Sequence, residues 1–288
     1  MRHPSRLLPL ALVALLWFSA EPAVAASSWL TSLPAAKAQA RESGKLMLVD
    51  LFADWCGWCK ELERSVYSTP QFQEYAKKFV LLRVDVEDGG EGTRLQSRFG
   101  ASSLPTTLIL DPHLALVGTV SGFHPTTTYI TQIETALAYH QDLVKRFDQA
   151  LASDDVHQLE SVAMEVYGRY DGQRAARAFD RLLVRGPQDP VAQGALRYRR
   201  ADALRLAEDF EQAGSAVAAG RKEALARADK LLVEHFDFLA SQIALDRGDC
   251  EKAKRAFESY LVQYPQGQLR RQASAALTEL KEHATTCI

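Results

Sequence analysis

Short apolar runs alternate with amphipathic stretches through the first half of the chain. Four of the runs are apolar or β-branched and are bounded by turn residues, which is typical of strands. They cover residues 45–53, 79–86, 106–111 and 116–122. Helical spacing follows them at residues 57–68, about 70–78, 92–99 and 125–140. This order predicts an α/β domain whose central mixed sheet is flanked by helices, with an antiparallel pair of strands near its end.

The strand signals stop after about residue 142, and the remaining chain has the spacing of helices only. Segments 168–187 and 248–265 can be aligned with each other. The alignment matches Ala175, Phe179 and Pro187 with Ala253, Phe257 and Pro265, and a weaker middle copy places Ala213 in the same register. Helical pairs repeated at 38 and 40 residues resemble tetratricopeptide hairpins, whose usual period is 34 residues. We therefore expect an all-α, tetratricopeptide-like second domain, with a plain helical bundle as the alternative.

The first 25 residues have the pattern of a secretory signal peptide. Arg2 and Arg6 precede an apolar run at 7–20, and the segment ends in Ala-Val-Ala at 23–25. The run is shorter than the roughly 20 apolar residues of a spanning helix, so a retained inner-membrane anchor is the weaker alternative. We predict a protein exported to the bacterial periplasm. Its predicted parts are a signal peptide at 1–25, an α/β domain at 26–141 and a helical domain at 142–288.

The charge balance limits the class of partner. Without residues 1–25 the chain carries 32 basic and 35 acidic residues, a formal net charge of about −3. It has no basic patch or basic helix face that could neutralise phosphates. Nucleic acid is therefore not an expected partner.

All four cysteines follow the predicted signal peptide, in a compartment where disulfides form and persist. Cys56 and Cys59 form a close pair, whereas Cys250 and Cys287 form a distant one. A Cys250–Cys287 disulfide would staple the C-terminus to the last repeat and contribute about 3 to 4 kcal/mol on the chain-entropy estimate. A second redox pair and free thiols are the alternatives for these two residues.

Three kinds of site fit the close pair in "ADWCGWCK". A zinc site needs two further ligands, but the nearby histidines at 113, 124 and 140 are scattered. A purely structural disulfide would close a very small loop and restrict the unfolded chain little. A redox pair has a physical reason for each cysteine. At a helix start, the free N–H groups and the helix dipole stabilise a thiolate on Cys56, and Cys59 lies one turn further on the same face. We therefore expect Cys56 to be the exposed attacking thiol and Cys59 the buried resolving thiol.

This segment resembles the thioredoxin superfamily. Residues of the family's types stand at Asp50, Ala53, Trp55, Cys56, Gly57, Cys59 and Lys60. The resemblance implies that Asp50, inside an apolar strand, is a buried proton relay for the resolving cysteine, with a raised pKa. An exposed position at a sheet edge is the alternative for Asp50. Arg83 stands where thioredoxins often carry a basic residue near the buried acid.

The resemblance also implies a substrate groove. Pro105, after Leu104, resembles the family's cis-proline that faces the cysteines, and Gly122 resembles the glycine that lets the last strand approach the groove. The groove residues implied by the resemblance are Trp55, Gly57, Trp58, Leu104, Pro105 and Gly122. Trp58 departs from the proline of thioredoxin itself, so the redox potential of thioredoxin does not carry over.

The leading hypothesis is an exported thiol-disulfide oxidoreductase that acts on protein thiols and disulfides without a bound cofactor or metal. The segment "YSTPQF" at 67–72 looks like that of exported thioredoxin-like reductases, which receive electrons from a membrane reductant. We therefore expect a reductase. A disulfide oxidase or isomerase is one alternative. Another is a co-chaperone or adaptor whose helical domain holds a protein partner.

Overall fold

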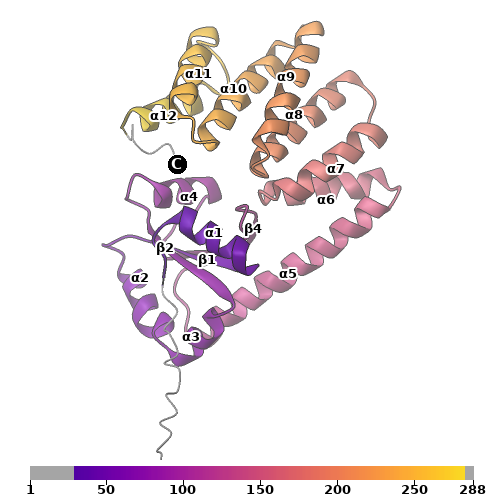
Figure 1. Ribbon diagram of the computed structural model, residues 1–288. Coiled ribbons are helices and arrows are strands. Elements are labelled where there is room, and N and C mark those ends of the chain that lie inside the picture. The colour runs from indigo at the N-terminus through magenta and orange to yellow at the C-terminus, as the bar shows by residue number, and fades with distance from the viewer. Residues whose placement is uncertain (1–28, 283–288) are drawn as a thin grey trace, which may run out of the picture.

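The computed structural model describes residues 29–282 (Figure 1). An α/β domain leads through one long helix into an array of helices that curves back toward it. The predicted signal peptide and Cys287 lie outside the described residues. Within residues 29–282, no helix is both long enough and apolar enough to cross a bilayer.

The centre of the α/β domain is a four-stranded sheet in the order β2-β1-β3-β4. β1 pairs in parallel with β2 and antiparallel with β3, and β3 pairs antiparallel with β4. The strands are β1 (Leu46–Phe52), β2 (Phe79–Asp85), β3 (Thr106–Leu110) and β4 (Leu116–Ser121). All four predicted strands and the antiparallel pair are confirmed.

Helices cover both faces of this sheet, which confirms the predicted fold class. They are α1 (Leu33–Ser43), α2 (Gly57–Leu62), the π-helical η1 (Glu63–Tyr67), α3 (Pro70–Ala76), α4 (Glu91–Phe99) and α5 (Thr126–Ala152). The core on one face contains side chains of α1 and α4, and the core on the other face contains side chains of α2, η1, α3 and α5. Helix α1 is absent from the prediction, because its buried side chains, Ala36 and Ala40, give little apolar periodicity.

Helix α5 joins the two domains without a break. Its first turns pack Tyr129 and Ile133 against the sheet, and its last turns pack Leu143 and Phe147 into the core of the helical domain. The predicted boundary between residues 141 and 142 therefore falls inside a continuous helix. The strand-to-helix change in the sequence marks where the sheet ends, whereas the helix that covers the sheet continues.

The helical domain consists of successive antiparallel hairpins. The helices are α6 (Val156–Gly168), α7 (Gly172–Arg185), α8 (Pro190–Leu206), α9 (Phe210–Ala226), α10 (Lys230–Asp246), α11 (Cys250–Gln263) and α12 (Arg270–Glu282). The aligned residues Ala175, Ala213 and Ala253 are fully buried on α7, α9 and α11, and Phe179 and Phe257 are buried at matching positions. An all-helical second domain is thus confirmed, while its tetratricopeptide assignment stays a prediction.

One turn geometry recurs in the hairpins. Tyr170, Glu208, Ala228 and Gly248 each have a positive φ, between 57° and 80°, and each is followed by an aspartate that caps the next helix. A left-handed backbone costs a non-glycine residue roughly 1 kcal/mol, which glycine does not incur. The structure therefore tolerates a small strain at Tyr170, Glu208 and Ala228, and the side chains of Tyr170 and Glu208 are used between the domains.

The turns that contain Tyr170 and Glu208 dock the helical array onto the α/β domain. The Tyr170 hydroxyl donates to the carbonyl of Arg98 at 2.5 Å, and its ring packs on Phe99 at 5.1 Å. Glu208 forms ion pairs with Lys37 and Arg41 of α1. These contacts hold helices α1 and α4 against the array.

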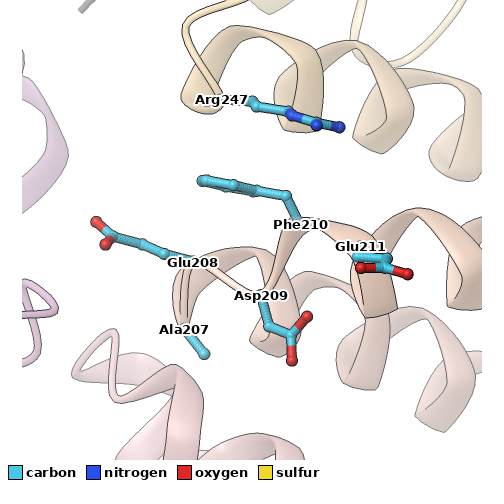
Figure 2. A pocket seen from close by; sticks show the side chains of 6 residues that line it. All are labelled: Ala207, Glu208, Asp209, Phe210, Glu211 and Arg247. Carbon is cyan, nitrogen blue, oxygen red and sulfur yellow. The ribbon is translucent and has the colours of Figure 1, made fainter.

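Two cavities lie at or near this interface. A cavity of about 760 Å³ lies between α1 and α4 on one side and α8, α10 and α12 on the other. A second pocket, of about 560 Å³, lies at the turn between α8 and α9. Figure 2 shows Phe210 facing Arg247 across it, while Glu208 points away from both.

Candidate active site

Cys56 and Cys59 are joined in a disulfide with an S–S distance of 2.05 Å. Cys56 is the residue before the first turn of α2, and its sulfur accepts a hydrogen bond from the backbone N–H of Cys59 at 3.1 Å. Serine and asparagine side chains cap helices in the same way. In the reduced protein this N–H favours the thiolate of Cys56, because a donated hydrogen bond stabilises the charged form.

Both sulfur-bearing side chains are buried in this oxidised form. Cys56 is 4% exposed and Cys59 is 2% exposed. The prediction of an exposed Cys56 is therefore wrong for the disulfide state, since both cysteines pack into the apolar cluster that includes Ala53 and Leu51. The exposed groups beside the pair are instead the rings of Trp55 and Trp58, at 68% and 62%.

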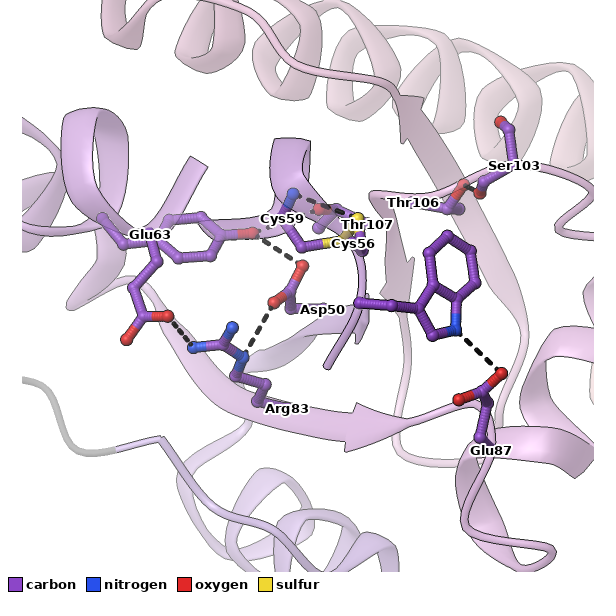
Figure 3. Close-up of a disulfide and its surroundings, with 11 residues drawn as sticks. Asp50, Cys56, Cys59, Glu63, Arg83, Glu87, Ser103, Thr106 and Thr107 are labelled. Atoms are coloured by element: carbon purple, nitrogen blue, oxygen red, sulfur yellow. Dashed lines mark hydrogen bonds and ion pairs between the residues drawn. A yellow bond between two sulfur atoms is a disulfide. The ribbon is translucent and has the colours of Figure 1, made fainter. Parts of the chain in front are cut away.

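Asp50 lies in β1 at 1% exposure, so its predicted burial is confirmed and the edge alternative is wrong. Successive strand residues face opposite sides of a sheet, and Asp50 shares its side with Leu48. In the sheet register, Asp50 lies opposite Arg83 on β2 and Thr107 on β3. Figure 3 shows its carboxylate between the disulfide and Arg83. The sheet thus brings the predicted acid and the predicted basic residue together beside the cysteines.

Burial raises the pKa of Asp50 from 3.8 to about 6, because a charged carboxylate is poorly solvated there. The positive charge of Arg83 and a hydrogen bond from Tyr67 act in the opposite direction, and the negative charge of Glu63 adds to the rise. Arg83 Nε lies 3.3 Å from Oδ2 of Asp50, and Arg83 Nη1 lies 2.8 Å from Oε2 of Glu63. An acid with this pKa is mostly ionised at neutral pH but can accept a proton there.

The structure adds three hydroxyl groups that the sequence did not single out. The Tyr67 hydroxyl donates to Oδ1 of Asp50 at 3.0 Å, and Tyr129 and Thr107 lie 3.2 and 3.4 Å from the same hydroxyl oxygen. Tyr67 stands in the family-like segment at 67–72, but nothing in that segment predicts which way its ring points.

The predicted groove residues lie near the disulfide on separate elements. The Leu104–Pro105 peptide bond is cis, as predicted. Gly122, with φ of 80°, donates its N–H to the carbonyl of Pro105 at 2.8 Å. Trp58 stacks on Phe123, with ring centroids 5.5 Å apart, so the loop after β4 reaches the active-site helix. The role of these residues in substrate binding stays a prediction.

Trp55 and Gly57 complete the set of predicted groove residues around Cys56. The indole N–H of Trp55 donates to Glu87 at 2.8 Å. An added Cβ on Gly57 would meet no atom within 4 Å, so the space above the first turn of α2 is open.

A surface pocket of about 310 Å³ reaches Cys59. Its lining includes Lys60, Glu63 and Arg83.

Two other sequence-derived sites have different outcomes. Within residues 29–282, no three His, Cys, Asp or Glu side chains are grouped closely enough to hold a metal ion. Cys250 begins α11 and packs partly buried against the last apolar cluster. The Cys250–Cys287 disulfide stays a prediction, because Cys287 lies outside the described residues.

Comparison with known proteins agrees with this geometry. The family model described as "Thioredoxin-like" matches residues 28–112. The α/β domain, from α1 into the first turns of α5, is thus a thioredoxin-like domain. The same part of the chain is similar to two proteins named "Thiol:disulfide interchange protein DsbD". The one from Haemophilus ducreyi is 38% identical over 69 residues, which are 24% of this chain and 12% of the relative. The one from Pseudomonas fluorescens is 40% identical over 74 residues, which are 25% of this chain and 13% of the relative.

The chain therefore spans about an eighth of the length of these curated relatives. Among solved structures, the thioredoxin-like domain is similar to a putative disulphide-isomerase from Bacteroides thetaiotaomicron. That match has 28% identity and a TM-score of 0.35, and covers 39% of this chain and 95% of the other. A thioredoxin from Thermus thermophilus matches at 25% identity with a TM-score of 0.35, over 38% of this chain and 86% of the other.

Proposed function

We propose that this protein is an exported thiol-disulfide oxidoreductase that reduces disulfides in other proteins. The observation that carries the proposal is the Cys56–Cys59 disulfide at the start of α2, with the buried acid Asp50 beside it. The name of the relatives, thiol:disulfide interchange protein, supports the same chemistry. The pair exchanges electrons through its own sulfur atoms, so the proposed reaction needs no bound cofactor.

The reaction starts from the reduced pair. The Cys56 thiolate attacks one sulfur of a substrate disulfide, a mixed disulfide forms, and the other substrate sulfur leaves as a thiolate that takes up a proton. Cys59 then loses its proton to Asp50 and attacks the Cys56 sulfur. A Cys56–Cys59 disulfide forms, the mixed disulfide breaks, and the second substrate sulfur leaves with the electron pair. The substrate gains two electrons, and the cysteine pair loses two.

The negative charge of Asp50 supports the reducing direction. A strongly oxidising dithiol is one whose reduced form is stabilised, mainly through its thiolate. At neutral pH the Asp50 carboxylate is mostly ionised, and a negative charge beside the cysteines disfavours a second negative charge on sulfur. This lowers the stability of the reduced form, which supports electron donation to substrates.

The cycle needs a donor that returns two electrons to the Cys56–Cys59 disulfide. A membrane-bound dithiol reductant is the proposed donor, and the bacterial periplasm is the proposed compartment. The helical domain is the proposed site for a protein partner.

The test uses the mature chain and insulin as a disulfide substrate. Cys56→Ser abolishes insulin reduction, whereas Cys59→Ser still attacks and accumulates mixed disulfides that can be isolated and identified. The Cys56→Ser/Cys59→Ser double variant is the matched control and traps nothing. Insulin reduction that persists in Cys56→Ser contradicts the proposal.

The direction is tested by the equilibrium of the Cys56–Cys59 pair with glutathione. A reductase has a potential near about −270 mV, the value of thioredoxin, and a strong oxidase has one near about −120 mV. A value close to the second figure replaces the reductase with an oxidase and leaves the site unchanged.

A further inference from the structure

The chemistry proposed above gives no role to three buried hydroxyl groups next to Asp50. They belong to Tyr67 on η1, Thr107 on β3 and Tyr129 on α5, and all three side chains are buried. A buried hydroxyl that lacks a partner costs free energy, so the partners of these groups carry information. Their partners are one another and the Asp50 carboxylate.

A π-helical turn directs Tyr67 to this place. The N–H of Ser68 donates to the carbonyl of Glu63, five residues earlier, at 3.2 Å. A π turn contains one more residue than an α turn and rotates the side chains that follow it. Helix α2, which carries Cys59, runs directly into this turn. Such turns are rare and are frequently found at functional sites.

The hydroxyl groups form a chain that ends at the acid. Thr107 Oγ1 lies 2.6 Å from the Tyr129 hydroxyl, which lies 3.2 Å from the Tyr67 hydroxyl. The Tyr67 hydroxyl donates a hydrogen bond to Oδ1 of Asp50 at 3.0 Å. An ionised carboxylate only accepts hydrogen bonds, so it is the natural end of a chain of donors.

The other groups that face Asp50 come from the neighbouring elements. Arg83 on β2 pairs with Oδ2, Glu63 on η1 pairs with Arg83, and the Cys56–Cys59 disulfide lies at the start of α2. Arg83 Nε is close enough for an ion pair but lacks the geometry of a hydrogen bond. Within residues 29–282, Tyr67 is the side chain that donates a hydrogen bond to Asp50.

We propose that Tyr67, held by Tyr129 and Thr107, is a positioning residue that fixes the orientation of Asp50 and the pH at which it accepts the Cys59 proton. The proposal rests on the proposed function, in which Cys59 passes its proton to Asp50 as it attacks the mixed disulfide at Cys56. Tyr67 touches neither the sulfur atoms nor the substrate in this scheme. It acts through Asp50.

The direction of the effect follows from the hydrogen bond. A donor to the ionised carboxylate lowers the pKa of Asp50 and opposes the effect of burial. Tyr67→Phe removes this donor and one oxygen atom, so the pKa of Asp50 rises by about one unit. Less of the acid is then ionised at pH 6, and Cys59 loses its proton more slowly. At pH 8.5 the acid is ionised in both proteins, and the rates converge.

The experiment measures two quantities on the mature chain. The first is the release of a peptide from a preformed mixed disulfide at Cys56, followed between pH 5 and 9. Tyr67→Phe slows release about fivefold at pH 6 and less than twofold at pH 8.5. The second is the titration of the Asp50 carboxyl carbon by NMR in the oxidised protein, which moves up by about one pH unit.

Three variants control the result. Tyr129→Phe leaves the donor to Asp50 in place and gives less than half of the Tyr67→Phe shift. Tyr139→Phe, on an exposed turn of the same helix and bonded to Glu165, gives no shift. In an Asp50→Asn background, Tyr67→Phe changes the release rate no further. Slower release at every pH, or an effect that persists in the Asp50→Asn background, overturns the proposal.

The carboxyl titration separates this proposal from the proposed function. It needs no substrate, so a shift in Tyr67→Phe supports the role of Tyr67 even if Cys59→Ser traps no substrate and the oxidoreductase proposal fails. Conversely, trapped substrates together with an unshifted Asp50 titration leave the oxidoreductase in place and overturn the role of Tyr67.

Discussion

Tyr170 and Glu208 occupy the same position in two successive hairpin turns, and both contact the thioredoxin-like domain. Two further turns have Ala228 and Gly248 at this position. The turn does not fix the side chain at this position, since tyrosine, glutamate, alanine and glycine all occur there. Docking of the two domains therefore depends on side chains that the turns themselves do not need.

Glu208→Gln should loosen helix α1. Glu208 pairs with Lys37 and Arg41 and is partly exposed, so the loss is worth about 0.5 to 1 kcal/mol. Hydrogen exchange measured by mass spectrometry should show exchange in residues 33–43 about two- to fivefold faster. The control is Glu211→Gln, an exposed side chain three residues later, which should leave this exchange unchanged. Exchange in α1 that is equal in both variants would show that this ion pair does not hold the domains together.

Gly172→Ala should destabilise the helical domain by about 1 to 3 kcal/mol. A Cβ at Gly172 would lie 2.3 Å from the backbone nitrogen of Ala207 and 2.4 Å from the carbonyl oxygen of Ala203, so α7 and α8 must move apart. Gly168→Ala is the matched control, because a Cβ there meets no atom within 4 Å. Urea unfolding followed by circular dichroism should show a loss for the first variant and none for the second.

Asp50→Asn should stabilise the oxidised protein at high pH. The folded-state pKa of Asp50 is raised from 3.8 to about 6, so the stability that the neutral acid contributes is complete below pH 3.8 and is lost as the pH rises through 6. Asparagine stays neutral and avoids this loss, which is worth about 3 kcal/mol at pH 8. The difference in the free energy of unfolding should vanish near pH 3.5. Asp54→Asn, in an exposed side chain, should change the free energy by less than about 0.5 kcal/mol at either pH.

Arg83→Gln and Glu63→Gln should move the titration of Asp50 in opposite directions. The Arg83 charge lowers the pKa of Asp50 and the Glu63 charge raises it. Stability should therefore be lost at a higher pH in Arg83→Gln, by about one unit, and at a lower pH in Glu63→Gln. Urea unfolding between pH 4 and 9 measures both shifts. A shift in the same direction for the two variants would mean that side-chain packing, rather than charge, dominates.

Much of the site follows from local patterns in the sequence. Asp50 alternates with Leu48 in an apolar strand, and strand alternation puts both on one buried face. The spacing of Cys56 and Cys59 predicts a close pair at a helix start, and the resemblance to thioredoxins implies the cis bond before Pro105. Each of these features can be recognised from a few neighbouring residues in the sequence.

The features that were missed depend on contacts between distant segments. Tyr67 reaches Asp50 because α2 passes into a π turn, and this turn is held by packing on the sheet and on α5. The predicted exposure of Cys56 is wrong for the disulfide form, because both cysteines pack against a core built from α1, α4 and three strands. The end of α5 was missed because its apolar side chains change partners at about residue 140 while the helix continues.

The length of α5 has a consequence for how the chain can be divided. Tyr129 on its first turn belongs to the hydroxyl chain at Asp50, and Phe147 near its end is part of the helical core. A proteolytic cut at residue 141 leaves the thioredoxin-like domain with a shortened helix, and leaves Leu143 and Phe147 in the helical domain on a helix that has lost its N-terminal turns. The two domains share one continuous helix at this point. A displacement of the helical hairpins would therefore be transmitted along α5 to Tyr129.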